Sequence, residues 1–364
     1  MFCMKKMLYA TSLYYPSRYA NRLQVLQTAE ALAKRLGDDF VLGCNKIAEF
    51  GDLYTHRFIN FLTARSPILA LRQMRYARAN GITVMYSREY SILFMMFLYN
   101  KVFRLPLTFV LEVHEAHTDY RFTFMIRRCA HIFCLTHGLA DDLRAAFDIN
   151  APITVLPDGV DIKAFAVTTD RTILRAKFGL PSNHHIVSYV GSVGTYAWKG
   201  VDVFLESLSH VKDPSIHYVV AGVKDGDFDE FRTTYAGLPV TFFGWMDRTE
   251  VAEIMHLSDA LVLPNKRGDV VSEKHTSPLK LFEYMASGTP IIASDLPSTR
   301  EILDDQSAFL VEPNNSAALA HAVDVICSSP EEAAQRASIA RNIVEKYSWD
   351  ARSKIIIDAL SHLV

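Results

Sequence analysis

The sequence contains no apolar run long enough to cross a membrane. Its longest uninterrupted apolar stretch is Ile92–Tyr99, whereas a spanning helix needs about 20 such residues. The first residues, Met1–Leu13, contain neither a long apolar core nor a cleavage site of small residues, so they do not resemble a secretory signal. We therefore expect a soluble, cytoplasmic protein. With 364 residues, half of them hydrophobic, the chain predicts two domains.

Cysteine is also scarce. The five cysteines are scattered, without the paired spacing of a zinc site or the density of a disulfide-rich domain. We expect them to be reduced core residues, and no motif predicts a bound metal. The net charge of −2 gives no reason to expect a nucleic-acid partner.

The charge is distributed unevenly along the chain. Residues 1–150 hold 19 lysines and arginines against 12 acidic residues, whereas the remainder holds 19 against 28. A basic first half predicts contact with something anionic, such as a phospholipid surface or a pyrophosphate-linked acceptor. A chance distribution of charge is the alternative.

Short strand-like runs alternate with amphipathic helical stretches along the whole chain, which predicts βα units and parallel sheets. The runs form two series, one on each side of a linker at Asp158–Pro181. A last helix is expected over Trp349–Leu363, with Ser348 as its N-cap. The predicted fold class is therefore α/β. Because such sheets bind ligands beyond the carboxyl ends of their strands, two of them facing one another would form a central cleft.

The segment Ser277–Asp295 predicts a loop, a helix that begins near Pro278 and stops at Gly288, and then a buried strand. The unpaired N–H groups of the helix start form a site for a diphosphate. Glu283 follows about one and a half turns later, where its carboxylate can accept hydrogen bonds from a ribose diol. An ordinary helix with a polar glutamate is the alternative.

Two further residues are expected at the carboxyl ends of strands. Lys199 follows the strand that ends near Gly191, and its ammonium can offset the charge of a departing diphosphate. His114 ends the apolar strand that begins at Phe109, where it can contact a sugar or orient an acceptor, and we prefer it to His117. The alternatives are a solvated turn for Lys199 and a buried core histidine for His114.

Ser277–Asp295 resembles the signature of retaining glycosyltransferase family 4, also called glycosyltransferase group 1. The stretches Tyr14–Leu26 and Val155–Asp161 extend the resemblance over nearly the full length. The resemblance implies a GT-B fold, with two Rossmann-like domains facing a central cleft. It implies an acceptor-binding domain at residues 1–165, a nucleotide-sugar-binding domain at 166–345, and a C-terminal helix at 346–364 that crosses back to the first domain.

The resemblance also implies the site residues. The catalytic residues would be His114, Lys199 and Glu283, with no metal required. The donor would be bound by Gly191, Ser192, Lys199, His275, Ser277, Pro278, Leu279, Lys280 and Glu283. The acceptor would be bound by Ser17, Arg18, Tyr19 and Asn21.

The sequence departs from the family pattern at three points, of which one is the first loop, where Arg18–Asn21 replaces the glycine pair found in many members. Where the family has a glutamate eight positions before Glu283, this chain has His275, with Glu273 two residues away. Where the family often has an arginine after the strand ending at Gly191, this chain has Ser192. The pair Lys266–Arg267 is a candidate for the missing cation, and a solvated charged loop is the alternative.

The function implied by the resemblance is front-face transfer, with retention, of a sugar from a nucleotide-diphosphate donor to a saccharide or lipid-linked acceptor. Bacterial surface polysaccharide or lipopolysaccharide assembly is the usual setting of such chains. A nucleotide-sugar 2-epimerase and a non-catalytic nucleotide-binding partner subunit are the alternatives.

The stretch Arg65–Arg78 predicts a basic amphipathic helix that docks on an anionic membrane, with arginines on one side and Ile68, Leu71 and Met74 on neighbouring faces. Arg127–Arg128 would extend this surface. An ordinary surface helix that packs its leucines and methionine on the sheet is the alternative.

Overall fold

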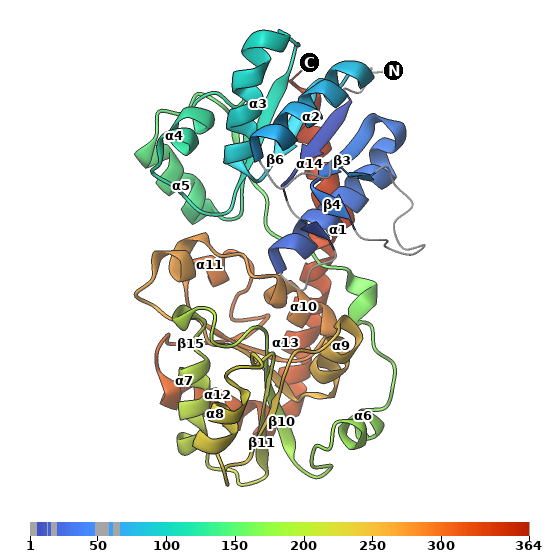
Figure 1. Ribbon diagram of the computed structural model, residues 1–364. Helices are drawn as coiled ribbons and strands as arrows, with labels where there is room; N and C mark the ends of the chain where they lie inside the picture. Colours follow the sequence, from blue (N-terminus) through green and yellow to red (C-terminus); the bar gives the residue numbers. More distant parts are fainter. Residues whose placement is uncertain (1–5, 13, 16–19, 48–57, 61–65, 364) are drawn as a thin grey trace. The chain divides into compact units, whose positions relative to one another are not determined.

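The computed structural model describes residues 6–12, 14–15, 20–47, 58–60 and 66–363 (Figure 1). The chain divides into two compact units. The first unit is Met1–Gly159 together with Trp349–Val364, and the second unit is Val160–Ser348.

In the described part of the first unit, a seven-stranded parallel sheet has the order β5-β3-β1-β6-β7-β8-β9. Its strands are β1 Met7–Ala10, β3 Phe40–Cys44, β5 Phe58–Asn60, β6 Val84–Ser87, β7 Thr108–Val113, β8 His131–Cys134 and β9 Ile153–Val155. The two-residue strands β2 Tyr14–Tyr15 and β4 Lys46–Ile47 form a separate parallel pair. Most strands read as continuous apolar runs because both faces of the sheet are covered.

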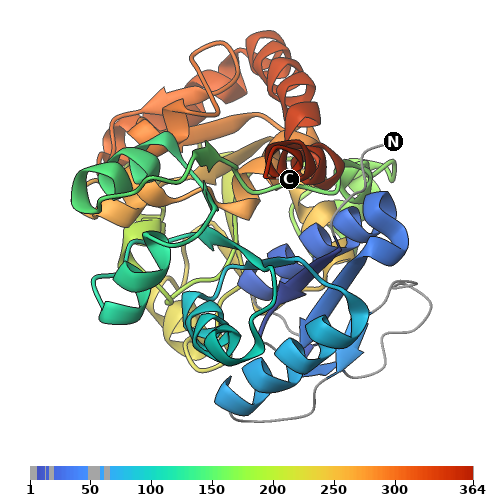
Figure 2. The same cartoon turned by 90° about the horizontal axis from the view of Figure 1, so that it is seen from above.

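Helices of the first unit lie on both faces of its sheet (Figure 1). They are α1 Ala20–Leu36, α2 Ser66–Asn80, α3 Tyr90–Phe103, α4 Tyr120–Ile126, α5 His137–Ala146 and α14 Trp349–Ser361, with a short 3-10 turn, η1, at Gly37–Asp39. Helices α2 to α5 pack on one face around Leu8 and Leu111. On the other face, α14 packs beside α1, and Ile356 and Leu360 join the core around Tyr9 (Figure 2). The last helix therefore belongs to the core of the first unit, as expected.

The second unit contains a six-stranded parallel sheet with the order β12-β11-β10-β13-β14-β15. Its strands are β10 His185–Val190, β11 Ile216–Ala221, β12 Val240–Phe243, β13 Ala260–Leu263, β14 Ile291–Ser294 and β15 Phe309–Val311. Its α-helices are α6 Arg171–Lys177, α7 Val201–Ser207, α8 Phe228–Thr234, α9 Arg248–Leu257, α10 Leu279–Ser287, α11 Pro297–Arg300, α12 Ser316–Ser328 and α13 Pro330–Ile343. Shorter turns are η2 Ile162–Phe165, η3 Ala197–Lys199, η4 Leu208–His210, the π-helical η5 Val271–His275 and η6 Val344–Tyr347.

The division of the chain differs from the expected boundaries at 165 and 346. Val160 and Phe165 are buried in the core of the second unit, so the second unit begins at Val160. Val344 is buried in the same core, and the chain returns to the first unit only at Trp349. The outgoing and returning segments run side by side, since the Val160 amide donates to the Tyr347 carbonyl over 2.9 Å. Burial of these apolar side chains, rather than the turn residues nearby, sets the boundary.

Candidate functional site

Lys199 lies at the carboxyl end of β10, in the turn that leads to α7. Its Nζ donates to the hydroxyl of Ser192 and lies 5.3 Å from the centre of the Tyr196 ring. Burial and the charge of Lys224 lower the pKa of Lys199 to about 8. Ser192, which replaces an expected arginine, therefore holds the lysine at this edge of the sheet.

Lys280 brings a second ammonium to the same place. It lies in the first turn of α10, and its Nζ donates to the Tyr189 hydroxyl over 2.8 Å. A Cβ added at Gly191 would lie 3.2 Å from this Nζ, so only a residue without a side chain leaves the ammonium its room. Burial and the nearby charge of Lys199 lower the pKa of Lys280 well below its usual range, against the opposing effect of Glu283.

The two lysines are close enough to affect one another. Among the described residues, neither Lys199 nor Lys280 forms an ion pair with a carboxylate. Two neighbouring cations repel one another, and a bound anion would relieve that repulsion. A diphosphate is an anion with enough oxygen atoms to meet both ammonium groups.

The start of α10 completes the site. Pro278 is the N-cap, one position earlier than the first helical residue Leu279, and its side chain forms no cap. The first N–H groups of a helix have no partner within it and carry the positive end of its dipole. Ser277 and His275 are buried directly before this start. The helix ends at Gly288, which has the positive φ of 72° expected of a helix stop.

Glu283 lies one turn beyond Lys280 on α10, and its side chain is 16% exposed. Burial raises the pKa of Glu283, while Arg248 and Lys280 lower it. Arg248, at the start of α9, places Nη1 3.6 Å from Glu283 Oε1. This partner was not predicted from the sequence. The carboxylate is thus held by a cation and retains acceptor positions for a diol.

The structure decides between the alternatives at two of the three departures from the family pattern. Glu273 Oε1 accepts from the Gly268 amide over 2.7 Å, so this carboxylate closes its own loop rather than standing in at position 275. Lys266 forms an ion pair with Asp202, so its charge is already balanced. Lys280, in contrast, is close enough to Lys199 for the two charges to interact.

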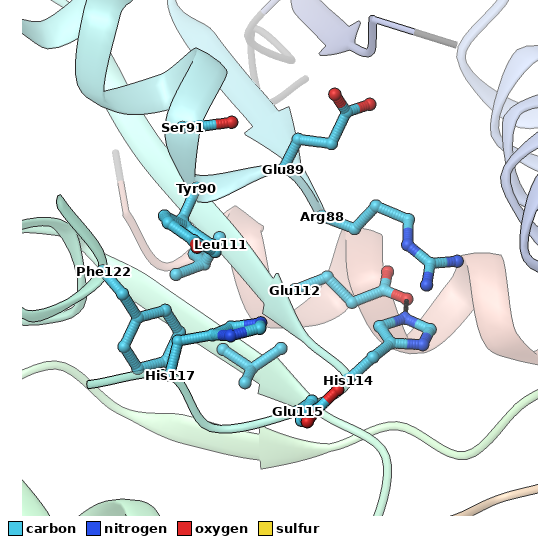
Figure 3. A pocket seen from close by; sticks show the side chains of 11 residues that line it. Arg88, Glu89, Tyr90, Ser91, Leu111, Glu112, His114, Glu115, His117 and Phe122 are labelled. Carbon is cyan, nitrogen blue, oxygen red and sulfur yellow. Dashed lines mark hydrogen bonds and ion pairs between the residues drawn. The ribbon is translucent and has the colours of Figure 1, made fainter. Parts of the chain in front are cut away.

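The first unit contains a hollow of about 280 Å³ at the carboxyl ends of β6 and β7 (Figure 3). It is lined by Arg88, Glu89, Tyr90, Ser91, Leu111, Glu112, Val113, His114, Glu115, His117 and Phe122. His114 follows β7 directly, and its Nε2 lies 2.5 Å from Glu112 Oε1. His117 also lines the hollow, and its ring packs against Tyr90 with ring centres 5.0 Å apart. The preference for His114 over His117 therefore stays a prediction.

The buried Glu112 was not predicted as part of the site. It accepts from Arg352 Nη2 on α14 over 2.8 Å and from Gln24 Nε2 over 2.6 Å, and Tyr86 donates to its second oxygen. Burial would raise the pKa of Glu112, but Arg352 and the hydrogen bond from His114 lower it well below its usual range. The position of Glu112 within an apolar strand indicates in the sequence that it has a buried partner, because burying an unpaired charge is very costly.

Most of the expected acceptor residues lie outside the part of the chain that the structure describes. Ser17, Arg18 and Tyr19 lie outside the described residues. Asn21 lies in the first turn of α1, and the structure does not describe its side chain.

Helix α2 buries an apolar side chain that the membrane-docking prediction needs to be exposed. Arg72, Arg75 and Arg78 are exposed, but Met74 is completely buried in the core of the first unit together with Leu69. The proposed role of Met74 in membrane contact is therefore wrong, because this side chain covers the sheet. Close to Arg127–Arg128 in the sequence, the apolar side chains of Phe122 and Met125 are buried as well.

Neither a spanning helix nor a metal cluster is found in the part of the chain that the structure describes. No helix there has both the length and the apolar character needed to cross a bilayer. No three or more His, Cys, Asp or Glu side chains gather there in a group that could hold a metal ion.

Comparison with known proteins gives a family for the second unit. Residues 184–329 match the family Glycosyl transferases group 1. The chain is 26% identical over 219 residues to the D-inositol 3-phosphate glycosyltransferase of Xylanimonas cellulosilytica, which covers 57% of this chain and 50% of the relative. It is 30% identical over 154 residues to the phosphatidyl-myo-inositol mannosyltransferase of Mycobacterium leprae, which covers 42% of this chain and 40% of the relative. The chain thus spans half or less of the length of these relatives.

A solved structure matches over nearly the whole length. Anabaena HepE, crystallised in complex with UDP, superposes with a TM-score of 0.80 at 18% identity and covers 98% of this chain and 100% of that chain. Two parallel sheets with flanking helices and a last helix that returns to the first unit define the GT-B fold. Part of the second unit, residues 184–329, is therefore similar to the group 1 glycosyltransferases. The resemblance inferred from Ser277–Asp295 is confirmed.

Proposed function

We propose that the chain is a retaining glycosyltransferase that moves a sugar from a nucleotide-diphosphate donor to a saccharide or lipid-linked acceptor. The observation that carries the proposal is the pair Lys199 and Lys280 beside the start of α10, inside the part that matches the family. Glu283 lies one turn further along the same helix. A diphosphate, followed by a ribose, fits this order of groups.

The donor is proposed to place its diphosphate against the two ammonium groups and the first N–H groups of α10. Glu283 would then accept hydrogen bonds from the ribose diol. Gly191, Ser192, His275, Ser277, Pro278 and Leu279 border the same site in this proposal. UDP-sugars are the first donors to test, because structures of Anabaena HepE hold UDP and UDP-glucose.

Bond cleavage leaves negative charge on the departing diphosphate, and a fixed cation at that point lowers the barrier. Lys199 has a pKa of about 8, so it is mostly protonated at pH 7 and can supply this charge. The acceptor hydroxyl attacks the same face from which the diphosphate leaves, and a leaving phosphate oxygen takes its proton. His114 is proposed to contact the sugar or the acceptor, and Ser17, Arg18, Tyr19 and Asn21 are proposed to border the acceptor.

The proposed setting is the assembly of bacterial surface polysaccharide or lipopolysaccharide, in the cytoplasm at the inner face of the cell membrane. One relative is named a D-inositol 3-phosphate glycosyltransferase and another a phosphatidyl-myo-inositol mannosyltransferase. Transfer should therefore be measured with both saccharide and lipid-linked acceptors.

We expect transfer from the preferred nucleotide sugar to persist in excess chelator, because two lysines and a helix start supply the positive charge at the diphosphate. The donor is first identified by thermal stabilisation with a panel of nucleotides, since a ligand at a hundredfold excess over its Kd adds about 2.7 kcal/mol to the stability. Transfer is then measured with and without EDTA. Complete loss of activity that magnesium or manganese restores would contradict the proposed site.

The same experiment separates the rival functions. Conversion of the nucleotide sugar to its 2-epimer without any acceptor would identify an epimerase. Nucleotide binding with neither transfer nor donor hydrolysis would identify a non-catalytic partner subunit.

We expect the first unit to bind anionic membranes through the exposed arginines of α2. Each basic residue near an anionic bilayer contributes about 1 kcal/mol, so Arg72→Ser, Arg75→Ser and Arg78→Ser together should weaken binding by about two orders of magnitude at low salt. Co-sedimentation with liposomes that contain or lack anionic lipid measures the effect. A control with the same loss of charge replaces three exposed residues elsewhere, Arg144, Arg232 and Lys354, by serine. Equal sedimentation of both triple variants would contradict a specific role for α2.

A further inference from the structure

Glu112 is surrounded by hydrogen-bond donors. Its Oε1 accepts from Gln24 Nε2 over 2.6 Å and from Arg352 Nη2 over 2.8 Å, and its Oε2 accepts from the Tyr86 hydroxyl. His114 Nε2 also lies 2.5 Å from Oε1. The Glu112 side chain is fully buried, so water does not compete for these positions.

The charge of Arg352 keeps Glu112 ionised. Arg352 is itself buried, and it also donates from Nε to the Pro157 carbonyl at 3.0 Å and from Nη1 to the Thr28 hydroxyl at 3.0 Å. An ionised carboxylate accepts hydrogen bonds and donates none. The hydrogen between Glu112 and His114 must therefore be carried by Nε2 of the histidine.

His114 remains neutral while it makes this bond. Burial and the positive charge of Arg88 lower its pKa to about 4, against the raising effect of Glu112. The charge of Glu112 is already balanced by Arg352, so it does not draw a second proton onto the ring. A neutral imidazole with a hydrogen on Nε2 has a bare lone pair on Nδ1.

Nδ1 is the atom that this arrangement leaves for a ligand. His114 lines the hollow, and Figure 3 shows its second ring nitrogen on the side of the ring away from the Glu112 carboxylate. Within the described part of the chain, the ring has no hydrogen bond other than that to Glu112.

We propose that Arg352, acting through Glu112, fixes His114 as the Nε2–H tautomer, so that Nδ1 accepts a hydrogen bond from a hydroxyl of the ligand in the hollow. A carboxylate or phosphate oxygen, which also only accepts, is not recognised by Nδ1. The identity of the ligand as a sugar or an acceptor saccharide rests on the proposed function, whereas the tautomer does not. Arg352 is thus a positioning residue on a helix about 240 residues away along the chain.

The charged groups that face His114 come from several elements. Glu112 comes from β7, Arg88 follows β6, and Arg352 comes from α14. Asp158, whose pKa burial raises to about 7, interacts with Arg352, Glu112 and Arg88 of the same network. The Nε2–H tautomer is therefore expected to be stable between pH 6 and 8 (roughly two units or more above the His114 pKa).

The test is ¹⁵N NMR of the histidine rings in the full-length, ¹⁵N-histidine-labelled chain. The signals of His114 are assigned as those that disappear in His114→Asn. The wild type is expected to show the Nε2–H form. In Glu112→Met, no acceptor faces Nε2, so nothing holds the hydrogen on that atom. A hydrogen bond to a charged group is worth about 1.5–3 kcal/mol, so the ratio of Nε2–H to Nδ1–H should fall at least about tenfold. Glu112→Gln is the control that keeps an acceptor: its amide oxygen can take the place of Oε1, which meets Arg352, Gln24 and His114, while its NH₂ faces the Tyr86 hydroxyl, so the Nε2–H form should persist.

The role of Arg352 is tested with Arg352→Met and the charge-retaining Arg352→Lys. Without the cation, Glu112 titrates at higher pH and its protonated form can donate, so the His114 signals of Arg352→Met should change between pH 5 and 8, while Arg352→Lys should restore the wild-type pattern. Asp350→Asn is the matched control, because Asp350 joins the same helix to Arg35 on the surface at 2.6 Å and should leave the tautomer unchanged.

An Nδ1–H or doubly protonated ring in the wild type at pH 7 would overturn the proposal. So would a Glu112→Met spectrum identical to that of the wild type. If Arg352→Met or Glu112→Met does not fold, the double variant Glu112→Met/Arg352→Met, which leaves neither buried charge unpaired, decides in its place. An inactive chain with the expected tautomers would leave the positioning role intact and count only against glycosyl transfer.

Discussion

Lys280→Met is expected to lower the rate of sugar transfer at least about 100-fold while the chain remains folded. The ammonium meets the charge that develops on the leaving diphosphate, and loss of one such fixed charge or donor costs about 3–4 kcal/mol of transition-state stabilisation. The transfer rates of Lys199→Ala and Glu283→Ala are expected to fall by a similar factor, since these side chains belong to the same proposed site. Steady-state kinetics with the preferred nucleotide sugar measures kcat and KM separately.

Although Lys280→Met should lose activity, its free energy of unfolding should not fall. Burial and Lys199 depress the pKa of Lys280, so the unfolded chain binds more protons than the folded one, and this lysine opposes folding below its unfolded pKa. Its removal should leave the ligand-free protein as stable as the wild type or more stable at pH 7, with a difference that shrinks as the pH rises toward 10.

The control is Lys266→Met, which removes the alternative cation that Asp202 already pairs. It should keep activity within about threefold of the wild type, because exposed ion pairs contribute at most about 1 kcal/mol. Normal transfer by Lys280→Met, or a large loss in Lys266→Met alone, would contradict the assignment of the second cation.

The fold was largely predictable because its signals are local. The main strands are short apolar runs followed by turn residues, and for this reason two series of strands were expected along the chain. The strand at Phe58–Asn60 and the pair Tyr14–Tyr15 with Lys46–Ile47 were not predicted. Two or three residues give too little alternation to distinguish a strand from a loop.

The donor side of the candidate site was predictable because one continuous segment carries most of it. Lys280 and Glu283 belong to a single helix whose start and stop are both marked in the sequence. The contribution of Arg248 to Glu283 was missed because it comes from another helix, and no local pattern links the two.

The network behind His114 could not be predicted from spacing at all. Glu112 stands out as a charge in an apolar strand, which indicates that a partner exists, but not which one. Arg352 does not stand out in this way, because the last helix also carries Asp350, Lys354 and Asp358. Many arginines satisfy the same requirement, and only the packing of α14 against α1 selects this one.

The largest loss of stability is expected from Arg352→Met. It leaves the Glu112 carboxylate buried without its cation, and breaking a buried ion pair from one side costs about 3–5 kcal/mol. Arg35→Met, which breaks the exposed pair with Asp350 between the same two helices, should cost at most about 1 kcal/mol. Urea denaturation of the three proteins gives the comparison.

The pH dependence identifies the cause of that loss. In the wild type, the pKa of Glu112 is depressed on folding, so its contribution to stability is present above the unfolded value of 4.5 and is lost as the pH falls through the folded value. Without Arg352, burial raises the folded pKa above 4.5, so the folded variant binds the additional proton and loses stability as the pH rises. The deficit relative to the wild type should therefore grow as the pH rises, and be clearly larger near pH 8 than near pH 4.5. A deficit that is independent of pH would mean that lost packing of the long arginine side chain, rather than the unpaired charge of Glu112, destabilises the variant.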